Sequence, residues 1–94
     1  MNNITKKSGI LIWSEENINT VPNNFGVYVI RSSPTNGAII SIEFSTNLRE
    51  DLLRHYKEET FSDAKFFDWY LTNTEEEAKS LCKEWKIKYN LQRP

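Results

Sequence analysis

The sequence is poor in cysteine and contains no long hydrophobic run. Cys82 is the only cysteine among 94 residues, so no disulfide can form within the chain. No apolar stretch is long enough for the core of a signal peptide or for a membrane span. We therefore expect a cytoplasmic protein that makes no contact with a membrane.

An excess of charge of one sign is also missing. The chain has 12 Lys and Arg against 13 Asp and Glu, a formal net charge of −1, and both signs are mixed along the sequence. Such a balance argues against a protein that binds nucleic acid or an anionic membrane through its overall charge. A local basic patch is still compatible with a neutral total.

The best local candidate for such a patch lies near the C-terminus. Segment 83–93 holds four basic residues and one acidic residue, interleaved with Trp85 and Tyr89. A solvated helical face explains this pattern, and so does a surface that binds nucleic acid. The candidate nucleic-acid-binding residues are Lys83, Lys86, Lys88 and Arg93.

Aromatic residues, by contrast, are plentiful. The chain has 3 Trp, 4 Tyr and 5 Phe, which help to build a core in a domain that buries roughly 60–65% of its unfolded surface. The length and the lack of an internal repeat indicate one domain over residues 1–94.

The first half of the chain predicts two paired strands. Residues 1–8 are polar and expected to be flexible, and residues 10–13 form either an edge strand or a segment packed on the core. The Asn-rich residues 17–24 indicate a loop. Residues 27–30 predict a strand covered on both faces, because they are apolar without a break. After a turn at Asn36 and Gly37, residues 38–44 predict its antiparallel partner.

The second half predicts a helix, a strand and a second helix. Ser45 or Thr46 can cap the first helix, whose apolar stripe is Leu48, Leu52, Leu53 and Tyr56. Residues 64–71 predict a third strand. A capping box at Thr74 then opens a helix whose apolar face is Ala78, Leu81, Cys82, Trp85 and Tyr89. The expected fold is α+β, a three-stranded antiparallel sheet flanked by helices in the order β-β-α-β-α.

Three short motifs resemble the GIY-YIG nuclease domain. Gly26-Val27-Tyr28 matches the first tripeptide of that family, residues 45–48 match the segment after the second, and Glu77-Ala78 matches the opening of the last helix. The similarity covers about residues 26–89. It implies the same small sheet with helices packed around it.

The resemblance also implies where the chemistry of the family would lie. In the family, two tyrosines, an arginine, often a histidine, and a glutamate that holds a divalent metal ion meet at the scissile phosphate. Tyr28 matches the first tyrosine and His55 matches the histidine. Each also has a simpler interpretation, Tyr28 as a core residue and His55 as a residue at the edge of the apolar stripe.

Four other family positions carry different residues. Ser41 replaces the second tyrosine, Glu43 the glycine of its tripeptide, Asp51 the arginine, and Cys82 the metal-binding glutamate. A neutral thiol is a poor ligand for Mg²⁺, which prefers oxygen. An acidic side chain in place of the arginine changes the interaction with a phosphate by about 6 kcal/mol at 5 Å and an effective dielectric constant near 20.

These substitutions favour a domain that binds a partner and does not cleave DNA. We expect no cofactor, and either a protein or a nucleic acid as the partner. The alternative is a divergent endonuclease that uses Mg²⁺ or Mn²⁺. A second alternative is a thiol or zinc site, for which Asp51, His55 and Cys82 would share one cleft with Glu43 as a fourth ligand.

Overall fold

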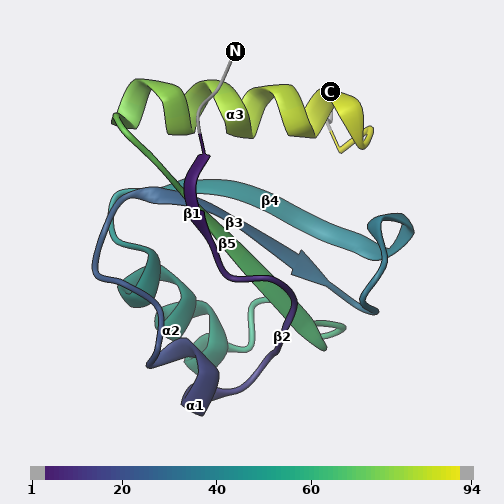
Figure 1. The fold of residues 1–94 in the computed structure, drawn as a ribbon. Coiled ribbons are helices and arrows are strands. Elements are labelled where there is room, and N and C mark those ends of the chain that lie inside the picture. The colour runs from purple at the N-terminus through teal and green to yellow at the C-terminus, as the bar shows by residue number, and fades with distance from the viewer. Residues whose placement is uncertain (1–3, 92–94) are drawn as a thin grey trace.

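An open antiparallel sheet forms the centre of the computed structural model, which describes residues 4–91 (Figure 1). Its strand order is β1-β5-β3-β4, and the short strand β2 also pairs with β5. The strands are β1 (Ile4–Lys7), β2 (Leu11–Ile12), β3 (Gly26–Arg31), β4 (Ile39–Ser45) and β5 (Phe66–Thr72).

Helices cover both faces of this sheet. The short helix α1 (Glu15–Ile18) and helix α2 (Leu48–Glu58) lie on one face, and helix α3 (Glu75–Lys88) lies on the other (Figure 1). A single 3-10 turn, η1 (Asn36–Ala38), connects β3 to β4. No helix within residues 4–91 is long and apolar enough to cross a membrane.

Strand β3 is the centre of the core, and all six of its residues are buried. Tyr28 and Ile30 pack with Leu48 of α2, whereas Val27 and Val29 pack on the α3 side of the sheet. Successive side chains of a strand point to opposite faces, so β3 contributes to two separate cores. The prediction of a strand covered on both faces is confirmed.

The caps of both long helices come from side-chain oxygens. Asn47 caps the N-terminus of α2, where its side chain accepts from the Glu50 amide at 3.2 Å. The prediction of Ser45 or Thr46 as the cap is wrong, because Asn47 is the extended residue that precedes the helix. Thr74 caps α3 as predicted and accepts from the Glu77 amide at 3.1 Å.

The sheet has five strands where the sequence predicted three. Residues 4–7, expected to be flexible, form β1, and residues 11–12 form β2, so the interpretation of 10–13 as an edge strand is confirmed. Residues 1–3 lie outside the described part of the chain. The start of the loop predicted at 17–24 belongs to α1. β1 was missed because all four of its residues are exposed, which leaves no alternation of apolar and polar residues.

Candidate functional site

Tyr28 of β3 and His55 of α2, the two residues that match the family motif, lie next to each other on the α2 face of the sheet. Tyr28 is 2% exposed, and its ring centroid is 6.0 Å from that of His55. Burial raises the pKa of the Tyr28 hydroxyl, and the nearby Glu43 and Asp51 raise it further. Burial lowers the pKa of His55, with a smaller contribution from Arg54. Tyr28 is therefore a protonated core residue next to acidic groups.

Asp51 is fixed by neighbours on two sides. The Ser45 hydroxyl donates to Asp51 Oδ2 at 2.5 Å, and Arg54 Nη2 donates to Oδ1 at 3.1 Å. The Ser45 hydroxyl in turn accepts from the Asn47 amide at 3.0 Å. This carboxylate closes the turn between β4 and α2, which is a structural role for the residue that stands in place of the family arginine.

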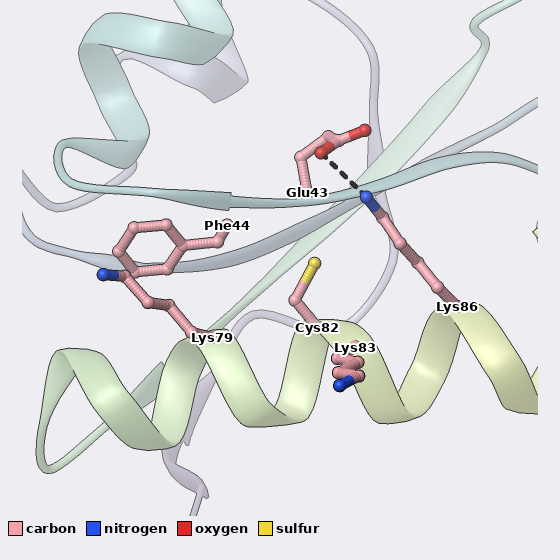
Figure 2. Close-up of a pocket in the computed structure, with 6 residues that line it drawn as sticks. All are labelled: Glu43, Phe44, Lys79, Cys82, Lys83 and Lys86. Atoms are coloured by element: carbon pink, nitrogen blue, oxygen red, sulfur yellow. Dashed lines mark hydrogen bonds and ion pairs between the residues drawn. The ribbon is translucent and has the colours of Figure 1, made fainter. Parts of the chain in front are cut away.

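Glu43 lies on the edge strand β4, and its carboxylate contacts Ser41 of the same strand and Lys86 of α3. The Ser41 hydroxyl donates to its Oε2 at 3.3 Å, and the ammonium group of Lys86, from α3, lies 3.2 Å from its Oε1 (Figure 2). About half of the Glu43 side chain is exposed. The acidic group is therefore at the edge of β4, where it pairs with a cation from the opposite face.

Cys82 does not join Asp51 and His55. Its side chain packs with Val29 and Ile42 in the core under α3, whereas Asp51 and His55 belong to α2 on the other face of the sheet. Among residues 4–91, no three His, Cys, Asp or Glu side chains are close enough to hold a metal ion. The structure therefore does not assemble the shared cleft expected for the thiol or zinc site.

The thiol is engaged with the backbone of β4. Cys82 is 6% exposed, and its Sγ donates to the Ile42 carbonyl at 3.7 Å. Burial raises the pKa of this thiol, an effect that Lys86 and the Phe44 amide partly offset. Cys82 is thus a small, protonated packing residue.

A groove of about 430 Å³ runs between β4 and α3 (Figure 2). Its lining residues are Glu43, Phe44, Lys79, Cys82, Lys83 and Lys86. Lys79 and Lys83 are exposed, and the Lys79 ammonium lies 5.4 Å from the centroid of the Phe44 ring. The groove therefore has an apolar floor and three cations, one of which is paired with Glu43.

The groove contains only part of the basic set predicted from the sequence. Lys83 and Lys86 line it, but Lys88 lies over the ring of Tyr89 at 5.3 Å, away from the groove. Arg93 is outside the described residues. Lys79 also lines the groove, although it was not in that set. The signal for it was the spacing of four residues, which places Lys79 next to Lys83 on a helix.

The direction of the backbone groups of β4 follows from strand geometry. The Arg31 carbonyl accepts from the Lys65 amide at 2.9 Å, which places it on the β5 side of β3. Residues an odd number of positions away direct their backbone groups to the other side. The backbone N–H and C=O groups of Tyr28 therefore point toward β4, and those of its register partner Glu43 point back toward β3.

Ile42 and Phe44, the neighbours of Glu43, consequently direct their backbone groups outward from the sheet. In the described part of the chain, β4 pairs only with β3, so no strand covers this edge. The Cys82 thiol is the group that contacts it, at the Ile42 carbonyl. The edge of β4 and the lysines of α3 together form one surface, which we call the β4–α3 groove.

A second polar cluster, which the sequence analysis missed, lies within the sheet. Asp68 is completely buried on β5 and accepts from Arg31 Nε at 2.8 Å and from Arg31 Nη2 at 3.1 Å. The Tyr70 hydroxyl also donates to Asp68. The pKa of Tyr70 is raised by burial and by this hydrogen bond. The available signal was an aspartate inside the apolar run of residues 66–71, since such a buried charge needs a partner.

No protein-family model, curated protein or solved structure matches this chain. The resemblance to GIY-YIG nucleases therefore stays a prediction from short motifs.

Proposed function

We propose that this domain is a protein-binding module with a GIY-YIG-like frame, and that it does not cleave DNA. The partner contributes an extended acidic segment that lies in the β4–α3 groove and pairs with β4. The observation that carries the proposal is the unpaired edge of β4 at the partly exposed Phe44, beside three lysines; Ile42, 1% exposed, is covered by Cys82. Main-chain pairing to such an edge supplies affinity, and side chains in the groove supply specificity.

The charge of the groove favours an acidic partner. Lys79 and Lys83 are exposed cations, and neither is in an ion pair among the described residues. Lys86 is held by Glu43, so the groove offers two available charges rather than a continuous basic stripe. Two cations suit alternate acidic side chains of a strand better than they suit a nucleic-acid backbone, where binding rises with the number of neutralised phosphates.

The surroundings of Tyr28, on the α2 face of the sheet, argue against nuclease activity. Burial raises the pKa of the Tyr28 hydroxyl, and the nearby Glu43 and Asp51, which raise it further, also oppose a phosphate there. Incubation with plasmid DNA and Mg²⁺ or Mn²⁺ tests this directly. We expect no cleavage, and cleavage that disappears in Tyr28→Phe would overturn the proposal in favour of a divergent endonuclease.

Binding is tested by fluorescence anisotropy with a labelled peptide of alternating Glu and Val. We expect saturable binding that the double variant Lys79→Glu/Lys83→Glu weakens by about tenfold or more, because two attractions become repulsions. Lys88→Glu is the control, since it reverses one charge on the same helix outside the groove, where the double variant reverses two. Equal losses in the two variants would contradict docking in this groove.

The strand-pairing part of the proposal has a separate test. The same peptide with N-methyl groups on alternate residues loses the N–H donors on one edge while keeping its charges. Binding should be lost for one of the two N-methyl patterns. If both patterns bind as well as the parent peptide, no strand is added to β4.

Two other occupants of the groove give different results. Tighter binding of duplex or single-stranded DNA than of the peptide, with affinity that falls steeply with salt, would identify a nucleic-acid module. A dimer in sedimentation experiments that Lys79→Glu/Lys83→Glu leaves intact, and that the peptide dissociates, would identify a second copy paired at β4.

A further inference from the structure

A second cavity lies on the α3 face of the sheet, away from the β4–α3 groove, and has a volume of about 240 Å³. It is lined by residues of β1, β3, β4 and β5, of the turn η1, and of the C-terminal end of α3 with its cap residue Tyr89. Its residues are Ile4, Lys7, Val29, Arg31, Asn36, Ile39, Tyr70, Trp85 and Tyr89. None of them lines the β4–α3 groove.

Arg31 gives this cavity a buried cation that is held in one orientation. The residue is 5% exposed, and its guanidinium group has five N–H donors. Four of them have acceptors. Nε and Nη2 bind Asp68, and Nη1 binds the Thr35 carbonyl at 3.1 Å and Asn36 Oδ1 at 2.8 Å. The fifth, the second hydrogen of Nη2, lies next to the Tyr70 hydroxyl, which shares Asp68 Oδ2 with Nη2 and also hydrogen-bonds to Arg31.

The neighbouring polar groups also offer donors rather than acceptors. The oxygen of the Asn36 amide is taken by Arg31, so its NH₂ group is the end that is free for a ligand. Asp68 accepts from both Arg31 and Tyr70, so its negative charge is already engaged. Lys7 adds an exposed ammonium group beside the cavity. The available donors and the single uncompensated positive charge fit a monoanion.

The remaining walls are apolar and aromatic. Val29 and Ile39 form aliphatic surface, and Trp85 stands edge-on to Tyr70 with ring centroids 4.7 Å apart. Packing of Trp85 against Tyr70, whose hydroxyl binds Asp68, restricts both rings. Small-ligand sites combine such apolar walls with a few convergent polar groups.

We propose that this cavity binds a small carboxylate with an apolar, flat body. The carboxylate accepts from the Asn36 amide and Lys7, beside the buried Arg31 guanidinium group, and the body lies against Trp85 and Tyr89. This site is independent of the function proposed above, since it shares no lining residue with the groove. The volume admits a ligand of about the size of benzoate or phenylacetate, below the usual range of roughly 300–1,000 Å³ for drug-sized ligands.

The test compares benzoate with its neutral analogue benzamide by NMR titration of ¹⁵N-labelled protein. We expect benzoate to shift the Asn36 side-chain amide and the Trp85 indole N–H, and benzamide to bind at least about tenfold more weakly. The proposal is wrong if benzoate moves neither signal up to about 10 mM, ten times a millimolar dissociation constant. It is also wrong if benzamide binds equally well.

Two variants assign the interaction to this cavity. Lys7→Gln changes an exposed residue and should weaken benzoate binding by roughly three- to tenfold. Trp85→Leu should weaken benzoate and phenylacetate by roughly tenfold, since it removes the aromatic wall. Lys83→Gln is the control on the far side of α3 and should leave the affinity unchanged. An equal loss in Lys83→Gln and Lys7→Gln would show non-specific attraction and overturn the assignment.

Discussion

The buried ion pair between Arg31 and Asp68 gives a stringent test of how the sheet is stabilised. The side chains are 7% and 1% exposed, and two nitrogens of Arg31 bind the carboxylate. The hydrogen bond and charge of Asp68 raise the pKa of Arg31 despite the opposing effect of burial. Asp68→Asn keeps the size of the side chain but leaves the guanidinium charge without a counter-ion.

The expected cost of Asp68→Asn is about 3–5 kcal/mol, the range for a buried charge that loses its partner. A domain of 94 residues has a free energy of unfolding of roughly 5–14 kcal/mol. The variant should therefore lose about a fifth or more of its stability. With a urea m-value of about 1–3 kcal/mol/M, the unfolding midpoint should fall by roughly 1–5 M.

Two further variants separate the effect of charge from that of packing. Arg31→Met/Asp68→Leu removes both charges and should recover most of the lost stability, because apolar side chains can replace a buried ion pair. Arg54→Gln breaks the exposed pair with Asp51 and should leave the unfolding midpoint nearly unchanged. A cost below about 1 kcal/mol for Asp68→Asn, or a double variant as unstable as the single one, would refute this reasoning.

Three other substitutions test the packing, capping and titration of the fold by urea unfolding. Gly26→Ala places a Cβ 2.4 Å from the Tyr70 carbonyl and should cost about 3 kcal/mol, whereas Gly37→Ala, with no atom nearer than 3.9 Å, should stay within about 0.5 kcal/mol. Thr74→Ala should cost about 1 kcal/mol and Thr74→Ser much less, since serine keeps the cap. Because the pKa of His55 is lowered on folding from 6.5, stability should be constant above about pH 6.5 and fall as the pH drops from there to the folded-state pKa. His55→Gln should remove that slope; a slope that persists would assign it to another group.

The sequence predicted the central elements because their patterns are strong. The uninterrupted apolar run at 27–30 and the helical stripe from Leu48 to Tyr56 fixed both the type and the packing of β3 and α2. The N-terminal strands could not be found in this way. β1 is exposed at every residue, and β2 has two residues, so their pairing with β5 depends on tertiary contacts.

The candidate sites were harder to predict because the face of the sheet that each helix covers does not follow from residue spacing. Asp51 and His55 are four residues apart and do share α2, as their spacing indicates. Cys82 was placed beside them by analogy alone, and α3 lies on the opposite face. The same ambiguity hid Arg31 and Asp68, which are 37 residues apart and meet only because β3 and β5 are neighbours.

Because side chains of a strand alternate between two faces, one bulge in β4 changes the faces of the residues that follow it. A shift in the β3–β4 register pairs Ile30 with Ser41 but Arg31 with Ile39, which leaves Ile40 as an extra residue. An extra residue reverses the faces of the side chains on one side of it relative to a regular strand. Ile39 and Ile42 therefore both reach the α3 core, although they are an odd number of residues apart. The motif alignment gives the positions of residues along β4. The face on which each side chain lies depends on the bulge at Ile40, which the sequence does not reveal.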